Sequence, residues 1–445
     1  MGKYFGTDGF RGEANKDLTA EHAYKIGRFL GHTLGAGAKV VIGKDTRRSS
    51  YMLEYATAAG LCASGADAYL LHVTTTPSVS YVTRTEDFAA GIMISASHNP
   101  YTDNGIKILG SHGEKVGDEL TAKIEEYLDR DPTLPLATGD KIGRTVDYFH
   151  GRNRYTGYLI SLSRHSYKGL RIGLDGANGS AWMLAKSVFD ALGAKTYVIG
   201  CEPNGFNINE GVGSTHLDAL GELVKREGLD IGFAFDGDAD RCLAVDESGT
   251  PIRGEAILYF MAKHLRGEGE LLGDTVVSTV MSNVGLERAL SQDGISLSLC
   301  DVGDRFVWER MTELGASLGG EESGHIIFSK YATTGDGLIT AIKITEALIE
   351  SGGKASELSR GLTLFPQLTK NVRVKNKDLA VKSPSVLRMK CECEASLHGE
   401  GRILLRKSGT EPVVRVMVEA EDSAVCEKIA TALAKEIEKA DGKAL

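Results

Sequence analysis

One order of features occurs three times along this chain, and this repetition constrains the fold more than any other property. Each segment has a short apolar strand, a glycine-containing polar loop, a helical stretch and a second apolar strand, which is the pattern of a βαβ unit. The units begin at residues 40–43, 170–174 and, more weakly, 275–280, and their second strands are 68–71, 196–199 and 295–299. Because parallel strands need a crossover connection, the sequence predicts three related α/β units.

A further helical stretch, a strand and a polar loop follow each unit. These loops span residues 95–100, 236–241 and 320–325. Ligands in α/β proteins bind at the carboxyl ends of strands, so three related units would direct three loops towards a shared cleft. After Pro366 the pattern changes to alternating strands and a closing helix at 424–440, which predicts a different, smaller domain.

We therefore expect an α/β protein with three related domains containing mixed sheets, and a smaller C-terminal α+β domain, around a central cleft. The length of 445 residues leaves room for three or more cores. The expected domain boundaries are 1–152, 153–254, 255–367 and 368–445.

Composition excludes several classes of protein. The net charge is −9, from 51 basic and 60 acidic residues, which argues against general nucleic-acid binding. No stretch approaches the roughly 20 apolar residues of a membrane span, and the first residues do not resemble a signal peptide. Seven scattered cysteines, an odd number, indicate reduced thiols in a cytoplasmic protein. Cys391 and Cys393 are expected on one face of a strand rather than around a metal.

An apolar strand at residues 90–94 ends abruptly in the sequence Ser-Ala-Ser-His-Asn-Pro. Pro100 stops any helix through this turn, and the residue before a proline is biased to extended geometry. Ser97 and His98 are therefore expected on a stiff, projecting loop that suits covalent chemistry at the Ser97 hydroxyl. Taken alone, the segment also fits an ordinary serine-rich turn.

Three carboxylates occupy alternate positions after the apolar strand at 231–235. They are Asp236, Asp238 and Asp240. Like charges so close repel unless a cation lies among them, and oxygen ligands with positions left for water or phosphate suit Mg²⁺. The alternative is a solvated acidic turn.

Two further loops carry groups suited to a phosphorylated sugar. Adjacent Glu321 and Glu322 can accept hydrogen bonds from sugar hydroxyls or an amine, and His325 can donate to phosphate, although a histidine beside a strand is more often structural. A second turn suits a phosphate monoester, because it combines cations, hydroxyls and a glycine, although a solvated charge cluster is the alternative; its residues are Arg406, Ser408, Gly409, Thr410 and Arg415.

With these motifs in order, the chain resembles the α-D-phosphohexomutase superfamily over its whole length. The resemblance rests on residues 6–12, 95–100 with 103–107, 236–241, 320–325, 333–337 and 406–412. It implies that Ser97 is a phosphoserine that donates and regains a phosphoryl group. It also implies that Asp236, Asp238 and Asp240 hold Mg²⁺ together with the phosphate on Ser97.

The resemblance assigns the other site residues as well. Charge stabilisation or proton transfer is expected from Arg11, His98, Lys107, Arg241 and His325. Sugar recognition is expected from Gly320, Glu321, Glu322 and Ser323. The phosphate that is not reacting is expected to bind Arg406, Ser408, Gly409, Thr410 and Arg415.

The amino-sugar branch of the superfamily is the most similar. This similarity implies conversion of glucosamine 6-phosphate to glucosamine 1-phosphate in the cytoplasm. The intermediate or activator would be glucosamine 1,6-bisphosphate or glucose 1,6-bisphosphate. The product would supply the synthesis of UDP-N-acetylglucosamine and of cell-wall precursors. The partner is a phosphorylated hexosamine, with no nucleic acid or membrane, and a homodimer is possible. One position departs from that branch, which commonly has Gln where this chain has Glu322.

Three alternatives stay open at this point. A phosphomannomutase/phosphoglucomutase would differ only in the hexose. A metal-dependent phosphatase using Ser97 would release inorganic phosphate. A non-catalytic sugar-phosphate sensor would bind ligand without carrying phosphate on Ser97.

Overall fold

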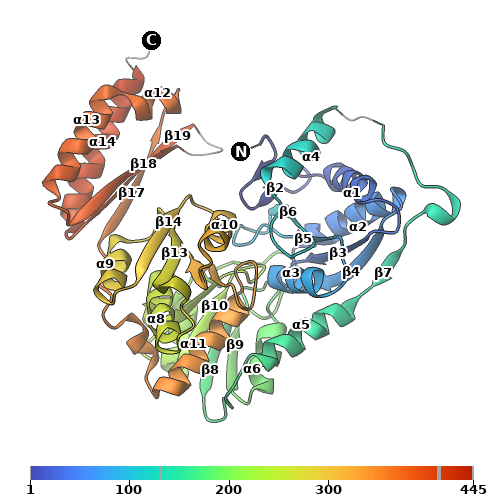
Figure 1. The fold of residues 1–445 in the computed structure, drawn as a ribbon, viewed down its shortest axis with the longest axis horizontal. Helices are drawn as coiled ribbons and strands as arrows, with labels where there is room; N and C mark the ends of the chain where they lie inside the picture. Colours follow the sequence, from blue (N-terminus) through green and yellow to red (C-terminus); the bar gives the residue numbers. More distant parts are fainter. Residues whose placement is uncertain (1, 131–132, 408–411, 443–445) are drawn as a thin grey trace. The chain divides into compact units, whose positions relative to one another are not determined.

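The computed structural model describes residues 2–130, 133–407 and 412–442, which form two compact units (Figure 1). The first unit comprises residues 1–281 and 295–360, and the second comprises 282–294 and 361–445. None of the helices in the described residues is long and apolar enough to cross a membrane.

The first sheet has seven strands in the order β1-β2-β6-β5-β3-β4-β7. Strands β5, β3, β4 and β7 run parallel, and β6, β2 and β1 are added antiparallel at one side. The strands are β1 Phe5–Gly6, β2 Gly9–Glu13, β3 Lys39–Lys44, β4 Asp67–Val73, β5 Ala90–Ile94, β6 Asp103–Leu109 and β7 Thr145–Asp147. The helices of this region are α1 Ala20–Leu34, α2 Arg48–Ala63, α3 Thr76–Thr85, α4 Asp118–Arg130 and α5 Phe149–Ser161.

The second and third sheets repeat the central part of the first. Their orders are β12-β11-β10-β8-β9 and β14-β13-β15-β16. The strands are β8 Arg171–Asp175, β9 Lys195–Ile199, β10 Ile231–Phe235, β11 Cys242–Val245, β12 Pro251–Ile252, β13 Thr275–Thr279, β14 Ser296–Cys300, β15 Leu318–Gly320 and β16 Ile326–Phe328. The helices of these regions in the first unit are α6 Leu184–Ala191, α7 Asp218–Glu227, α8 Gly254–Gly267, α10 Asp304–Leu314 and α11 Gly337–Ser351.

One four-strand order is common to all three sheets. It reads β4-β3-β5-β6 in the first, β9-β8-β10-β11 in the second and β14-β13-β15-β16 in the third. In each case the first three strands are parallel and the fourth is antiparallel. The connection between the third and fourth strands is the polar loop singled out in the sequence. The predicted class of three related α/β regions with mixed sheets is confirmed.

Apolar packing fixes the strands that carry these loops. All five residues of β5 and all five of β10 are buried, as expected for central strands covered on both faces. Helices α1 and α2 cross closely because glycines face the partner backbone: a Cβ on Gly27 would lie 2.3 Å from the Thr57 carbonyl oxygen. This close crossing packs α1 and α2 into the main core of the first region.

The second unit has a three-stranded antiparallel sheet in the order β17-β19-β18. Its elements are α9 Val284–Gln292, β17 Gln367–Arg373, α12 Lys377–Lys382, α13 Pro384–Ser396, β18 Gly401–Lys407, β19 Val413–Ala420 and α14 Ser423–Gly442. The predicted small α+β domain and its closing helix are confirmed. The strand expected around Cys391 and Cys393 is wrong, because both cysteines lie in α13. The four domain boundaries stay predictions.

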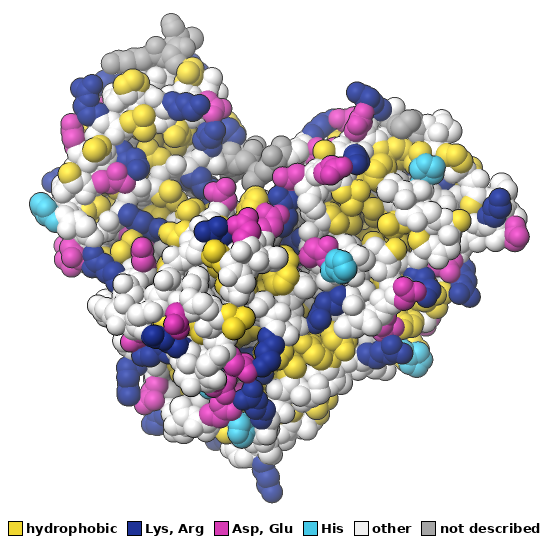
Figure 2. All heavy atoms as spheres, viewed as in Figure 1, with side chains coloured by type: hydrophobic (Ala, Val, Ile, Leu, Met, Phe, Trp, Pro, Cys, Tyr) yellow, Lys and Arg dark blue, Asp and Glu magenta, His cyan; other side chains and the backbone are white. Residues whose placement is uncertain are grey.

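The surface carries charges of both signs. Figure 2 shows basic and acidic side chains interspersed over the face in view, without a continuous basic area. The seven cysteines are all free thiols, as the sequence analysis expected.

Candidate active site

Ser97 lies in the loop that connects β5 to β6, with its side chain fully buried. Its backbone has a φ of +53°, a left-handed conformation that is uncommon for serine. The Ser97 amide donates to Ser95 Oγ at 2.9 Å, and its carbonyl accepts from Arg47 Nη2 at 3.1 Å and Asn209 Nδ2 at 2.9 Å. These bonds hold the turn rigidly, and the hydroxyl donates to Asp236 Oδ2.

His98 and Arg241 flank the hydroxyl. His98 Nδ1 lies 3.4 Å from Ser97 Oγ and 3.1 Å from Arg241 Nη1. Burial, and next the charge of Arg241, lower the pKa of His98 to about 4. The imidazole is therefore neutral near pH 7 and can accept the hydrogen bond from the guanidinium.

The three predicted aspartates lie together in the loop between β10 and β11, and all are buried. One carboxylate oxygen from each falls within 4.8 Å of the others. Burial and the charges of Asp240 and Asp238 raise the pKa of Asp236 to about 8, whereas the charge of Lys107 outweighs burial and lowers that of Asp240 to about 2. With no metal ion among the three carboxylates, Asp236 is therefore largely protonated near pH 7.

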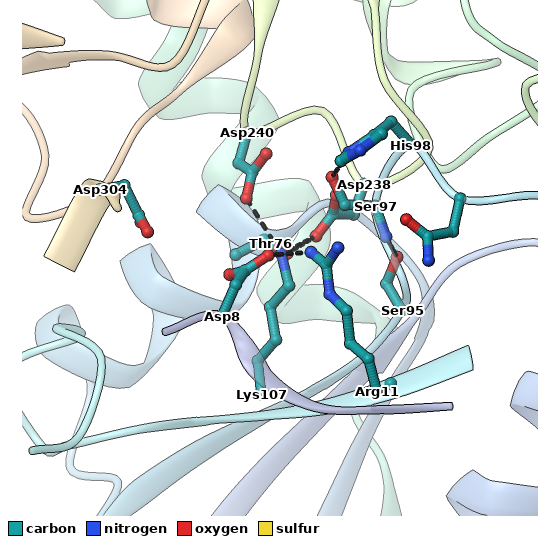
Figure 3. Close-up of polar contacts among 12 residues, drawn as sticks. Asp8, Arg11, Thr76, Ser95, Ser97, His98, Lys107, Asp238, Asp240 and Asp304 are labelled. Carbon is teal, nitrogen blue, oxygen red and sulfur yellow. Dashed lines mark hydrogen bonds and ion pairs between the residues drawn. The ribbon is translucent and has the colours of Figure 1, made fainter. Parts of the chain in front are cut away.

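Lys107 is the cation at the centre of this cluster (Figure 3). Its Nζ lies 2.7 Å from Asp238, 3.0 Å from Asp240 and 3.2 Å from Asp8. Burial lowers the pKa of Lys107, but these three carboxylates outweigh it and raise the pKa well above the ordinary value. Thr76, at the start of α3, also donates to Asp238 through its hydroxyl. Lys107 is therefore a fixed cation and not a proton acceptor.

The residues present fit a divalent cation. Asp238 Oδ1 and Asp240 Oδ1 are buried and have no hydrogen-bond partner, although buried polar atoms are nearly always paired. Carboxylate oxygens are the ligands that Mg²⁺ prefers. Asp236, Asp238 and Asp240 can therefore hold Mg²⁺ with an oxygen of Ser97 or of a phosphate on it.

We expect Mg²⁺ to raise the thermal stability of the protein in the absence of any substrate. At a concentration a hundred times its dissociation constant, a ligand of the native state contributes about 2.7 kcal/mol. Affinity is expected to fall as the pH is lowered from 8 to 6, because the ion competes with the proton on Asp236. Thermal unfolding with and without Mg²⁺ checks the stability, and titration calorimetry at pH 8 and pH 6 checks the affinity. We expect Asp238→Asn to bind Mg²⁺ at least about tenfold more weakly. The exposed Asp190→Asn should bind it with the wild-type affinity. Equal affinities in the two variants would contradict the site.

His325 precedes β16 and links the aspartate loop to α10. Its Nε2 lies 3.1 Å from Asp304 Oδ2 and 3.0 Å from the Gly335 amide nitrogen, and its Nδ1 lies 3.7 Å from Asp240 Oδ1. Burial lowers the pKa of His325, but the charges of Asp304 and Asp240 outweigh it and raise the pKa above the ordinary value. His325 is thus part of the cluster, which favours a role in the site over a purely structural one.

The loop expected to read the sugar starts at Gly320, the last residue of β15. Glu321 accepts from the Gly303 amide at 3.2 Å, and the Ser323 hydroxyl donates to Glu321 Oε2 at 3.4 Å. Glu322 lies 3.4 Å from Arg253 Nη2. The surroundings of the two carboxylates therefore differ. Glu321 lies beside the Gly303 amide and near Arg241, whereas Glu322 lies beside the partly exposed Arg253.

The predicted phosphate turn belongs to the second unit. Arg406 on β18 pairs directly across the sheet with Arg415 on β19. Ser408, Gly409 and Thr410 lie outside the described residues. Two arginines opposite each other concentrate positive charge at this end of the sheet, as a phosphate requires.

Within the first unit, one buried cluster brings together the nucleophile, the aspartates and their cations. Arg11 on β2 belongs to this cluster because it forms an ion pair with Asp8. Sequence reasoning missed Asp8, Thr76, Lys115 and Asp304 as site residues. Lys115 pairs with both Asp8 and Asp304. Asp8 could have been found from its place three residues before Arg11 in a glycine-framed motif, but no local signal marks Lys115.

Four segments of the chain match one family, described as phosphoglucomutase/phosphomannomutase. The matches are alpha/beta/alpha domain I over residues 2–134, domain II over 153–249, domain III over 253–364 and the C-terminal domain over 370–436. They follow the same order along the chain as the three sheets and the second unit.

Individual proteins are similar over nearly the full length. Phosphoglucosamine mutase of Lachnospira eligens is 59% identical over 437 residues, 96% of each chain. A phosphoglucomutase/phosphomannomutase family protein of Burkholderia thailandensis has a TM-score of 0.80 at 24% identity, over 99% of this chain and 98% of that chain. N-acetylphosphoglucosamine mutase of Aspergillus fumigatus, solved with GlcNAc-6P and magnesium, has a TM-score of 0.69 at 16% identity, over 98% and 96%.

Proposed function

Because the chain belongs to the phosphoglucosamine mutase family of the α-D-phosphohexomutase superfamily, we propose that Ser97 carries the phosphoryl group that interconverts glucosamine 6-phosphate and glucosamine 1-phosphate. One observation carries the assignment of the residue: the buried Ser97 hydroxyl bonds to Asp236 in a cluster of three aspartates. A folded protein gains little from burying so many like charges unless the site binds something.

The reaction consists of two phosphoryl transfers. In the first, a hydroxyl oxygen of the sugar phosphate attacks the phosphorus on Ser97, the bond from phosphorus to Ser97 Oγ breaks, and the proton that the sugar hydroxyl loses passes to Ser97 Oγ. The resulting sugar 1,6-bisphosphate then reverses its orientation. In the second transfer, Ser97 Oγ attacks the phosphorus of the other phosphate, the bond from that phosphorus to its sugar oxygen breaks, and the proton of the Ser97 hydroxyl passes to that sugar oxygen. Such transfers depend mainly on in-line positioning and charge neutralisation.

Fixed cations surround the position of the transferring group. Arg241 Nη1 lies 3.1 Å from His98 Nδ1, which is next to Ser97. Arg11 and Lys107 both form ion pairs with Asp8 in the same cluster. Mg²⁺ held by Asp236, Asp238 and Asp240 would neutralise charge on the phosphoryl oxygens. Arg241 and Arg11 each have a buried Nε without a partner, which leaves donors for phosphate oxygens.

We assign sugar recognition to Gly320, Glu321, Glu322 and Ser323, and binding of the second phosphate to the turn 406–415. The bisphosphate intermediate, the cytoplasmic location and the homodimer are proposals from the same family membership. The seven free thiols support the cytoplasmic location, because disulfides are rare in cytoplasmic proteins.

A coupled assay tests the reaction. With Mg²⁺ and a trace of sugar bisphosphate, we expect faster turnover of glucosamine 6-phosphate than of glucose 1-phosphate or mannose 1-phosphate. Preference for the neutral hexoses would move the function to phosphomannomutase/phosphoglucomutase. Phosphate release without isomerisation would indicate a phosphatase, and binding without turnover would indicate a sensor.

We expect Glu322→Gln to reduce the preference for the amino sugar over glucose 1-phosphate by about tenfold. The carboxylate can pair with a protonated amine, and a charge-assisted bond contributes more than a neutral one. The ratio of kcat/KM on the two substrates checks this, with the exposed Glu119→Gln as control. An unchanged ratio would remove Glu322 from sugar selection.

A further inference from the structure

A cavity of 590 Å³ lies in the first unit and contains none of the proposed catalytic side chains. We call it the arginine-lined cavity and define it by Arg48, Tyr51, Thr74, Arg152, Ser180 and Trp182. Its volume is in the range of pockets that bind small metabolites. None of the described residues that line it is acidic, although the chain as a whole carries a net charge of −9.

Two buried hydroxyls in its wall lack partners. Thr74 is 1% exposed and Ser180 is 4% exposed, and neither side-chain oxygen has a hydrogen-bond partner. Leaving a buried polar group unpaired costs about 1–3 kcal/mol. Both residues line the cavity, so a rotation of either side chain would bring its hydroxyl to a polar ligand there.

Its two arginines are held without carboxylates. The Arg48 guanidinium lies 5.5 Å from the centre of the Phe206 ring, and Arg152 Nη1 donates to the Val73 carbonyl at 3.2 Å. Neither forms an ion pair with an acidic side chain in the part of the chain that the structure describes. Guanidinium groups in such a setting favour phosphate, which they bind through paired N–H donors.

Aromatic rings complete the wall. Tyr51 comes from α2 and Trp182 from the loop between β8 and α6. Flat rings of this kind stack on nucleobases and contribute about 1–3 kcal/mol per base. A phosphate alone would leave the aromatic wall uncovered.

We propose that the arginine-lined cavity is a second ligand site that binds a nucleoside phosphate and modulates the enzyme. The phosphate pairs with Arg48 and Arg152, the hydroxyls of Thr74 and Ser180 bond to its polar atoms, and the base lies against Trp182 and Tyr51.

Three connections lead from the cavity wall to the catalytic loops. Thr46 lines the cavity, and the next residue, Arg47, donates to the Ser97 carbonyl. Two residues beyond Thr74, the Thr76 amide donates to the Asp238 carbonyl at 3.0 Å. The Ser180 amide donates to the Gly237 carbonyl at 2.8 Å. A ligand that holds this wall in one conformation also favours one conformation of the loops that carry Ser97 and Asp238. Binding at the cavity and binding at the active site therefore affect each other reciprocally.

The binding experiment uses the full-length protein, with UMP and AMP as probes. We expect the fluorescence of Trp182 to change on binding, and the change to disappear in Trp182→Phe. The double variant Arg48→Gln/Arg152→Gln is expected to bind at least about tenfold more weakly, because each arginine loses charged bonds to phosphate. The exposed pair Arg226→Gln/Arg360→Gln serves as the charge-matched control.

Further arms locate the ligand. Binding that persists with saturating glucose 6-phosphate supports a separate site, whereas displacement by that sugar phosphate, with equal affinity in the double variant, would overturn it. If inorganic phosphate or ribose 5-phosphate bound as tightly as UMP and AMP, the nucleobase would not contribute to binding. That result would overturn the proposal of a nucleoside ligand.

Kinetics test the modulation. In the wild type, saturating nucleotide should change kcat/KM by at least about fivefold, the lower range of coupling between sites. The double variant should keep the basal kcat/KM and lose the response. An unchanged rate in the wild type at saturating nucleotide would overturn the regulatory role and leave the reaction assigned to Ser97 untouched.

Discussion

Ser97→Ala is expected to lower kcat/KM by at least about 10⁴-fold, because the variant lacks the oxygen that bonds to phosphorus. Folding should persist. The lost hydroxyl makes a bond to Asp236, whose raised pKa keeps it mainly neutral near pH 7, and such a bond contributes about 0.5–1.5 kcal/mol. Thermal unfolding and the coupled assay measure the two effects separately. Wild-type turnover in this variant would end the assignment of the nucleophile.

Ser95→Ala is the matched control for this experiment. Ser95 Oγ accepts from the Ser97 amide, so its removal loosens the turn and leaves the nucleophile in place. We expect a loss of about tenfold in kcat/KM, the effect of misplacing a reacting group slightly. Intact mass spectrometry after exposure to sugar bisphosphate should detect a phosphoryl group on this variant and none on Ser97→Ala.

Lys107→Met is expected to have the largest effect on stability. The side chain is 1% exposed and contacts three carboxylates, and removing one partner of a buried charge pair costs about 3–5 kcal/mol. Methionine has a similar length, so the loss is mainly electrostatic. The thermal midpoint should fall in metal-free buffer and recover partly with Mg²⁺, which supplies positive charge to the same aspartates.

Lys123→Met provides the comparison for a surface ion pair. Lys123 pairs with Glu119, but its side chain is 59% exposed. Exposed pairs contribute about 0–1 kcal/mol, so this variant should unfold close to the wild-type temperature. Equal shifts for the two variants would show that the charge balance at Lys107 does not stabilise the fold.

The fold was predictable to a large extent because the local signals agreed with one another. Uninterrupted apolar runs marked β5 and β10 as buried strands, and polar loops marked their ends. The failure at Cys391 and Cys393 has a clear cause. Two cysteines at a spacing of two suggested a strand, whereas buried or partly buried Val386, Met389, Cys393 and Leu397 follow the spacing of a helix.

The candidate site was predictable only where one loop carries several functional groups. Asp236, Asp238 and Asp240 are close in sequence, so their proximity in space could be inferred. The pairing of Lys115 with Asp304 joins residues 189 positions apart and depends on tertiary packing, which no local pattern encodes. The same holds for Lys107, whose position in the sequence was clear but whose three carboxylate partners were not.

The shared strand order of the three sheets bears on the ancestry of the molecule. In each sheet, the connection between the third and fourth strands of the shared order has a left-handed residue near its tip: Ser97, Ala239 and Gly324, with φ of +53°, +56° and +88°. Such agreement in three places indicates an internal repeat, as the duplication of one segment would produce. The copies then diverged, so that a nucleophile, an acidic loop and a glutamate–histidine loop now occupy equivalent positions. No copy can take over from another, and a damaging mutation in any of the three tips is expected to inactivate the whole enzyme.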